Sequence, residues 1–367
     1  MARLFQEWRD AGANVTALHS LSEQEYRAAG NPFVRRWRMY PQYALTCWRT
    51  ARRRRLPPPI RVVTTNPFFA PALVARSVRD KGITVNLVYD LFPDALVHSG
   101  RLNADSWLAS RCASVTRYAL RECDVSVFLG RRLLAHAEST YGPARRATVI
   151  PVGADGSGFR LFPPEPRRQG APPRILYCGL MGAMHDVDTL AAVLVGRSPV
   201  PVEWQFHACG VGYERLKSVV GAVPNVTWDG PLEDGPWRRA MLDSDVALVT
   251  VGAGAERVVM PSKSYSALVA GQAVLAICSR ESDLADLIVA HDCGWVVEPG
   301  DVNGLRWVLR QIGGNAGDVM ARRRRAFRAG QEFYDMKPIA REWFELFREL
   351  SGTARSAIAF PGAERRP

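Results

Sequence analysis

Two glycine-rich turns in the second half of the sequence have the residue types of an anion-binding site. The first, Gly179-Leu-Met-Gly182, follows a short apolar run, and His185 comes three residues later. Glycines let backbone amides approach a phosphate closely, and a helix that starts there adds a favourable partial charge. We therefore expect Gly179, Gly182 and His185 to contact a phosphate or sugar. The alternative for His185 is a capping or packing role.

The second turn leads into the densest group of polar side chains, in the segment 252–266. A Gly-rich loop follows a β-branched run, and Pro261-Ser262-Lys263 begins a helix. A lysine in the first turn of a helix opposes the helix dipole and favours a bound anion. With Arg257 and Ser262 beside it, Lys263 is predicted to bind a phosphate. The alternative is an exposed lysine whose stem covers apolar surface.

Carboxylates occur at two further places. Asp186 and Asp188 have the DxD spacing of metal-dependent transferases, but the helix dipole favours acidic residues in a first turn in any case, so no metal ion and no cofactor are predicted. Asp90 ends a predicted strand in the first half, and Asp94 and His98 follow it. A carboxylate at this place can act as a base or orient a hydroxyl group, with helix capping as the alternative.

Short apolar runs alternate with amphipathic segments along the chain, which is typical of parallel sheets covered by helices. The predicted strands of the first half are 14–19, 60–65, 83–89, 125–129 and 147–152. Those of the second half are 174–178, 202–208, 225–228, 246–251, 273–278 and 294–297. Ligands of open parallel sheets bind beyond the carboxyl ends of the strands, where the glycine turns and Asp90 are predicted to lie.

The alternation is interrupted once, by a segment rich in Gly and Pro. The fold class is therefore α/β, with two doubly wound, Rossmann-like domains. We predict an N-terminal acceptor-binding domain at 1–152, a linker at 153–173, a second domain at 174–330, C-terminal helices at 331–350 and a flexible tail at 351–367. A length of 367 residues, 47% of them hydrophobic, is enough for two separate cores.

The chain has 48 basic and 36 acidic residues, a formal net charge of +12. Part of the excess surrounds Trp37, in Arg35, Arg36 and Arg38, and continues in the run 52–55. Such a segment suits anionic lipid head groups or nucleic acid, and a solvated helix face is the alternative. No nucleic-acid recognition module accompanies the arginines, so that partner ranks last.

Other features of the sequence favour a cytoplasmic protein. No apolar run is long enough to cross a bilayer, and the first residues carry charges that a signal peptide would lack. The seven cysteines include no CxxC pair, so we expect reduced, buried thiols. A second arginine run, 322–325, is expected on a solvated helix face.

Several segments of the second half resemble the donor-nucleotide half of bacterial family 4 glycosyltransferases, in the branch of colanic-acid, exopolysaccharide and O-antigen assembly. They are YCGLMGAMHDVDTL, PNVTWDGPLEDGPWRRAMLDSDVALVTV, PSKSYSALVAGQAVLA and SRESDLADLIVAHDCGWVVEPGD. In the first half, LVYDLFPDALVHSGRL and ATVIPVGAD are similar to segments of the same family. The resemblance spans residues 1 to 350, approximately, in matching order.

The resemblance implies a GT-B fold, with two Rossmann-like domains facing across a cleft and a C-terminal helix packing back toward the first. It implies a hexosyltransferase that moves a sugar, with retention and without a metal ion, from a nucleoside diphosphate to a polysaccharide or lipid-linked precursor. Glu256, Arg257, Ser262 and Lys263 would bind the donor with the glycine turn. The Arg35–Arg38 segment would contact the anionic inner face of the plasma membrane, near the acceptor.

The sequence departs from the family in three places. Many members have a second glutamate eight residues after the first, but Ser264 or Ser266 stands there after Glu256. Ribose recognition is therefore expected to pass to Glu281 or Asp283, or to be weak. The Arg and Lys that often follow the glycine turn are absent. The chain also begins inside what resembles the first helix, so we expect a natural start further upstream or a compromised first domain, without its first strand.

Two other functions stay open. A catalytically inactive GT-B-like scaffold or nucleotide-binding subunit is favoured by the missing ribose carboxylate and the missing first strand. A sugar-nucleotide epimerase would need an acid and a base for which the sequence offers no convincing positions.

Overall fold

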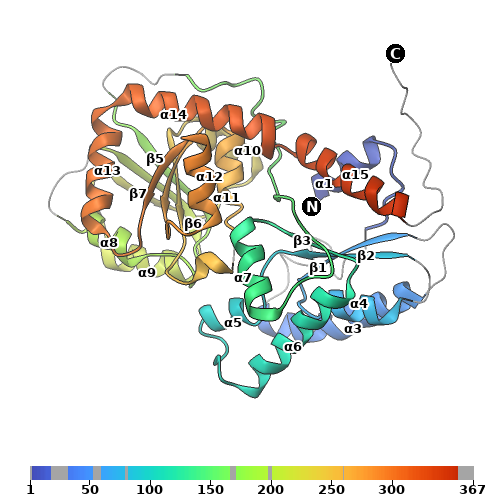
Figure 1. The fold of residues 1–367 in the computed structure, drawn as a ribbon. Coiled ribbons are helices and arrows are strands. Elements are labelled where there is room, and N and C mark those ends of the chain that lie inside the picture. Colours follow the sequence, from blue (N-terminus) through green and yellow to red (C-terminus); the bar gives the residue numbers. More distant parts are fainter. Residues whose placement is uncertain are drawn as a thin grey trace, which may run out of the picture. The chain divides into compact units, whose positions relative to one another are not determined.

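In the computed structural model the chain forms two α/β units, each containing one parallel sheet (Figure 1). The structure describes residues 2–17, 32–52, 59–78, 82–165, 171–196, 201–258 and 260–353. The first unit comprises Met1–Val97, Leu102–Ile150 and Ala340–Pro367, and the second comprises His98–Arg101 and Pro151–Ile339. The first unit is therefore assembled from both ends of the chain.

The sheet of the first unit has the strand order β1-β2-β3-β4. Its strands are β1 (Ile60–Thr64), β2 (Ile83–Val88), β3 (Val125–Phe128) and β4 (Ala147–Val149). The helices are α1 (Ala2–Asp10), α3 (Pro32–Arg52), α4 (Ala70–Ser77), α5 (Asp94–His98), α6 (Trp107–Glu122) and α7 (Arg131–Tyr141). Because each connection moves one strand along in the same direction, right-handed crossovers place α4, α6 and α7 on one face.

The C-terminal helix α15 (Met336–Thr353) packs on α1. The ring centroid of Trp8 lies 5.5 Å from that of Trp343 and 5.3 Å from that of Phe347, both edge-on. All three side chains are buried, and edge-to-face aromatic pairs are favourable. The end of the chain thus stabilises its beginning, in agreement with the predicted packing of the C-terminal helix on the first domain.

The sheet of the second unit has the order β10-β9-β8-β5-β6-β7. Its strands are β5 (Arg174–Leu180), β6 (Glu203–Cys209), β7 (Val226–Asp229), β8 (Val246–Thr250), β9 (Ala273–Ile277) and β10 (Gly294–Val297), and every neighbouring pair is parallel. The chain builds the sheet outward from β5 to β7, then returns and builds it from β8 to β10. The sheet is therefore doubly wound, with its reversal between β5 and β8.

Helices cover both faces of this sheet. They are α8 (Asp188–Leu194), α9 (Val211–Val220), α10 (Asp234–Leu242), α11 (Lys263–Val269), α12 (Asp283–His291), α13 (Val302–Gly314) and α14 (Ala316–Ala329). One apolar core contains side chains of α8, α9 and α13, and the other contains those of α10, α11, α12 and α14. Strand residues alternate between the cores, as in β9, where Leu275 faces the first and Val274 the second.

Ten of the predicted strands are confirmed, with ends shifted by a few residues. The strand predicted at 14–19 is wrong for residues 14–17, which form no strand, and residues 18 and 19 lie outside the described part. Residues 153–165, the described part of the predicted linker, belong to the second unit, where Ala154 forms a β-bridge with Asp335 and Phe159 is fully buried.

The cysteines were predicted to be reduced and buried. All seven are free thiols, and five are buried. Cys178 is partly exposed and Cys209 is exposed, so the prediction of buried thiols is wrong for Cys209. Within the described ranges, no helix combines the length and the apolar composition needed to cross a membrane.

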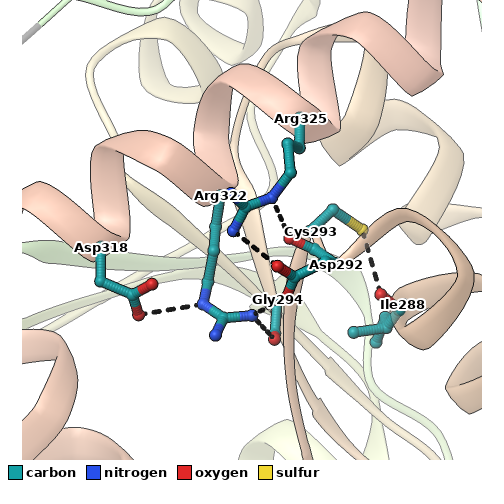
Figure 2. Close-up of polar contacts among 7 residues, drawn as sticks. All are labelled: Ile288, Asp292, Cys293, Gly294, Asp318, Arg322 and Arg325. Atoms are coloured by element: carbon teal, nitrogen blue, oxygen red, sulfur yellow. Dashed lines mark hydrogen bonds and ion pairs between the residues drawn. The ribbon is translucent and has the colours of Figure 1, made fainter.

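In the arginine run of α14, the prediction of a solvated face is wrong for Arg323, which is buried, and for Arg322 and Arg325, which are partly buried. Arg324 is exposed, as predicted. Figure 2 shows Arg322 and Arg325 reaching the end of α12, where Asp292 has a left-handed φ of 43°. Arg322 Nη1 donates to the Asp292 carboxylate and to the Gly294 carbonyl, both at 2.7 Å, and Arg325 Nε donates to the Asp292 carbonyl at 2.6 Å. The arginines thus supply donors just past a helix end, where carbonyls lack helical partners.

Arg323, between them in sequence, is buried under the sheet. Its Nη1 lies 3.0 Å from Asp245 Oδ1 and its Nε donates to the Gly271 carbonyl at 3.2 Å. Asp245 Oδ2 in turn accepts the backbone N–H of Arg174 at 2.9 Å. The pair joins α14 to the beginnings of β5 and β8, so both charges are compensated where water is excluded.

We predict that Arg323→Met destabilises the protein by about 3 kcal/mol or more, because it removes a buried cation 3.0 Å from the buried Asp245 carboxylate. The free energy of unfolding, measured with a chemical denaturant, tests this. Arg324→Met, on the exposed side of the same helix, is the matched control and should change it by less than about 0.5 kcal/mol. Equal effects of both substitutions would contradict the prediction.

Candidate functional site

The two glycine-rich loops predicted from the sequence meet at the carboxyl edge of the second sheet. β5 pairs with β6 along its whole length, but its pairing with β8 consists of Ile175 and Leu176 alone. The loops that follow β5 and β8 are joined where Gly252 N donates to the Met184 carbonyl at 2.8 Å. Ligands of doubly wound sheets bind at such a reversal of strand order, so this edge is the candidate site.

The turn after β5 depends on a glycine. Gly179 has a φ of +104°, which side chains other than glycine rarely adopt, and a Cβ there would lie 3.4 Å from Lys263 Cε. Gly182 has no such restriction, and a Cβ there would meet no atom within 4 Å. Met181 N donates to the Cys209 carbonyl at 2.8 Å, which fixes the turn to the end of β6.

Lys263, the first residue of α11, reaches across to this turn. Its Nζ donates to the Leu180 carbonyl at 3.0 Å and lies 5.3 Å from the centroid of the Tyr177 ring. The Tyr177 hydroxyl donates to the same carbonyl at 2.8 Å. Burial lowers the pKa of Lys263. The structure therefore brings the predicted lysine and the predicted glycine turn together, with Tyr177 as a residue that the sequence analysis missed.

His185 closes the glycine turn. The backbone N–H of Gly182 donates to His185 Nδ1 at 3.0 Å, so the neutral ring carries its proton on Nε2. Burial, reinforced by the charge of Lys263, lowers the pKa of His185 to about 4. The histidine is thus neutral at pH 7, and the backbone N–H that Gly182 was predicted to offer a phosphate already donates to His185.

The loop after β8 holds the other predicted donor residues. Arg257 is exposed at the end of the short 3₁₀ helix η1 (Ala255–Arg257), and Ser262 is exposed at the start of α11. Ser266 is partly buried one turn further on. Glu256 Oε2 is buried, and the part of the chain that the structure describes offers it no hydrogen-bond partner.

The residues expected to replace the ribose carboxylate follow the next strand, β9. Glu281 is exposed, and its backbone N–H donates to Ser279 Oγ at 3.1 Å. Asp283 lies in the first turn of α12, where the helix dipole favours a carboxylate. Both stand at the same sheet edge as the glycine turns, beyond β8.

The carboxylates with DxD spacing, Asp186 and Asp188, bind protein groups. Asp186 accepts hydrogen bonds from the backbone N–H and the hydroxyl of Thr189, at 2.9 and 3.0 Å, in the first turn of α8. Asp188 pairs with Arg215 at 2.6 Å. Among the described residues no group of three or more His, Cys, Asp or Glu could hold a metal ion.

In the first unit, the predicted catalytic carboxylates differ in their surroundings. Asp90 is half-buried at the end of β2, and burial raises its pKa. Asp94 Oδ2 accepts the Tyr141 hydroxyl at 2.9 Å and lies 3.3 Å from His136 Nε2. The sequence analysis missed both partners, because they stand more than forty residues away in α7 with no telling spacing.

The remaining predicted residues make no contact with these carboxylates that the structure describes. His98 is exposed at the end of α5. Arg35, Arg36, Trp37 and Arg38 belong to α3, but their side chains lie outside the described part. Their contact with a membrane therefore stays a prediction.

Comparison with known proteins supports the fold. No protein-family model matches the chain. The solved structure of sucrose-phosphate synthase from Thermosynechococcus elongatus superposes with a TM-score of 0.69 at 14% identity, over 96% of this chain and 92% of that one. HepE of Anabaena, solved with UDP, gives a TM-score of 0.63 at 13% identity, over 84% and 82% of the two chains.

These structures and the two parallel sheets confirm the predicted fold class, an α/β protein of the GT-B type. One curated relative also matches, a protein named as a probable glycosyltransferase, WbjE, from Pseudomonas aeruginosa. It is 22% identical over 240 residues, which span 62% of this chain and 59% of the relative's length.

Gly179→Ala should lower the free energy of unfolding by about 1–2 kcal/mol, because alanine is strained at a φ of +104°. Gly182→Ala is the control and should have an effect below about 0.5 kcal/mol. Chemical denaturation of both variants tests the pair. A Gly182→Ala effect as large as that of Gly179→Ala would show that the turn geometry is not the cause.

The lowered pKa of His185 predicts a pH-dependent stability. Unfolded histidine binds a proton near pH 6.5 and the folded residue near pH 4, so acid favours the unfolded state between these values. The contribution of His185 to the free energy of unfolding is fully present above pH 6.5, and up to about 3 kcal/mol of this free energy is lost as the pH falls to 4. Denaturation curves of the parent and of His185→Asn, which cannot titrate, should diverge over this range. Parallel curves would refute the assignment.

Proposed function

We propose that the chain is a glycosyltransferase that takes its sugar from a nucleoside diphosphate. The observation that carries the proposal is the meeting of two glycine-rich loops, Lys263 and neutral His185 at the edge beside β5 and β8. Cations and polar donors at such an edge suit a diphosphate. The similarity to WbjE, and the fold shared with HepE, which was solved with UDP and with UDP-glucose, support it.

In this proposal the second unit stabilises the leaving diphosphate. Negative charge grows on the diphosphate oxygens as the bond to the sugar breaks, and cations held in place lower the barrier. Lys263 and Arg257 supply positive charge. His185 supplies the Nε2–H as a donor without placing a second buried cation beside Lys263.

The first unit would present the acceptor. A hydroxyl oxygen of the acceptor forms a bond to the anomeric carbon while the carbon–oxygen bond to the diphosphate breaks, and the hydroxyl proton passes to the leaving diphosphate. Attack from the leaving-group side gives retention, and no protein nucleophile is needed. Asp90 is the residue proposed to orient the hydroxyl, because the Asp94 carboxylate already binds Tyr141 and His136.

The finer assignments belong to the same proposal. The transferred sugar is a hexose, and the acceptor is a polysaccharide or lipid-linked glycan precursor, as in the colanic-acid and exopolysaccharide branch of family 4. The proposed location is the cytoplasmic face of the membrane. Neither a metal ion nor a cofactor is part of the mechanism, and the engagement of Asp186 with Thr189 supports this.

A second candidate is a nucleotide-binding subunit without transferase activity. It is favoured by the neutral side chain, Ser264 or Ser266, at the position where many family 4 members have a ribose-binding carboxylate. The two candidates differ in one measurement: both bind the nucleotide, but only the transferase releases it from a sugar nucleotide when an acceptor is present.

Calorimetric titration with UDP, GDP, dTDP and ADP tests the site itself. We expect one of them to bind, and Lys263→Met to weaken that binding by about tenfold to a hundredfold, because a charge-assisted hydrogen bond is lost. Methionine keeps the apolar stem over Tyr177, so the melting temperature should change little. Lys217→Met, which removes a lysine 5.9 Å from the Tyr213 ring, is the matched control.

Unchanged affinity in Lys263→Met would remove this lysine from the site. Failure of the folded parent to bind any of the four nucleotides would overturn the proposed function.

A further inference from the structure

The backbone carbonyl of Leu180, the last residue of β5, accepts two side-chain hydrogen bonds. Lys263 Nζ donates to it at 3.0 Å, and the Tyr177 hydroxyl donates to it at 2.8 Å. A carbonyl oxygen has two lone pairs, so these two donors use both of them. Tyr177 and Lys263 are thus coupled through one shared acceptor in the glycine turn.

Tyr177 is held in place by the core of the second unit. Its side chain is 1% exposed and packs in the apolar core that also contains side chains of α8, α9 and α13. The centroid of its ring lies 6.3 Å from that of Phe206 on β6 and 6.2 Å from that of His185, the second pair edge-on. A ring in a close-packed core has little freedom to move, so its hydroxyl and its faces keep fixed positions.

Lys263 has fewer partners than Tyr177. Its Nζ lies over the Tyr177 ring, 5.3 Å from the centroid, where the ring attracts a cation. Within the described ranges the Leu180 carbonyl is its one hydrogen-bond acceptor, although an ammonium group carries three N–H donors. Tyr177 therefore acts on the lysine in two ways, through its ring and through the shared carbonyl, and N–H groups of the lysine are left for a further acceptor.

We propose that Tyr177 is a positioning residue of the donor site, which sets how strongly Lys263 binds a diphosphate. The inference rests on the proposed function. Phosphate oxygens compete with the Leu180 carbonyl for the N–H groups of Lys263, and hydrogen bonds between charged groups are the stronger ones. The Tyr177 hydroxyl favours the diphosphate in this competition, because it occupies one lone pair of the carbonyl and keeps it hydrogen-bonded when the lysine turns to the phosphate.

A second tyrosine of the same unit provides an internal control. The Tyr213 hydroxyl donates to the Asp229 carbonyl at 3.1 Å, and Lys217 Nζ lies 5.9 Å from the centroid of the Tyr213 ring. In the part of the chain that the structure describes, Lys217 makes no hydrogen bond to that carbonyl. The tyrosine, the carbonyl and the lysine are present there without the shared acceptor, so Tyr213→Phe is the matched substitution.

Calorimetric titration of the full chain with UDP, GDP, dTDP and ADP tests the inference. Tyr177→Phe keeps the packed ring and removes the hydroxyl, and it should weaken nucleotide binding about threefold to tenfold, as expected for one hydrogen bond. In the Lys263→Met background the same substitution should change the affinity by less than about twofold, because no lysine is left to position. Tyr213→Phe should leave the affinity unchanged in both backgrounds.

NMR signals of the lysine side chains measure the geometry without any nucleotide. The chain has four lysines, so isotope-labelled lysine gives a small set of signals, from Lys81, Lys217, Lys263 and Lys337. The ε protons of Lys263 should lie upfield of their position in the unfolded chain, both in the parent and in Tyr177→Phe, because an aromatic ring faces them in both. This measurement separates the loss of the hydroxyl from a displacement of the lysine.

Equal nucleotide affinity of Tyr177→Phe and the parent would overturn the inference and leave the proposed function intact. An equal loss in the Lys263→Met background, or the same loss in Tyr213→Phe, would overturn it too, since either would show a general effect on the fold. Without any variant, ε protons of Lys263 at their unfolded-chain position in the parent would also overturn it. Failure of the folded parent to bind any of the four nucleotides would overturn the proposed function, and this inference with it.

Discussion

The second unit depends on one constraint of parallel sheets: all strands end at the same edge, whatever their order in the chain. The chain builds outward from β5, then reverses and builds from β8, so the loops after these two strands become neighbours although more than sixty residues separate them. The bond from Gly252 to the Met184 carbonyl joins them. The glycine turn, His185 and the loop leading to Lys263 are positioned by this reversal, and the buried Arg323–Asp245 pair fixes the opposite ends of the same strands.

The carboxyl edge of the second sheet holds basic side chains whose positive charge is only partly compensated. Burial disfavours a positive charge on both Lys263 and His185, and the charge of Lys263 adds to the effect at His185, so the pKa of each group is lowered. A carbonyl and an aromatic ring offset the lysine charge only in part. An anion that arrived there would raise the pKa of both groups and gain their hydrogen bonds, which is why an edge of this composition favours a diphosphate over a neutral sugar.

The periodicity of the sequence was sufficient to predict the ten strands and the doubly wound class, because buried strands and amphipathic helices leave different patterns. The same reasoning brought Gly179, Gly182, His185 and Lys263 into one site, since the ends of parallel strands converge. It failed where a contact joins distant elements: nothing in the spacing of Asp94, His136 and Tyr141 indicates their hydrogen bonds. It failed again at Arg322 and Arg323, because a run of arginines has no apolar pattern, and burial there depends on acidic and carbonyl partners far along the chain.

The path of the chain through the two units has a consequence for synthesis on the ribosome. The second unit is almost wholly one continuous stretch, and the bridge between Ala154 and Asp335 brings its two ends together. It can therefore fold as soon as that stretch has emerged. The first unit cannot be completed then, because Trp8 packs on Trp343 and Phe347, which are translated after the second unit. The first unit therefore begins to emerge before the second but is completed after it, and the apolar face of α1 has no packing partner in α15 until α15 has been translated.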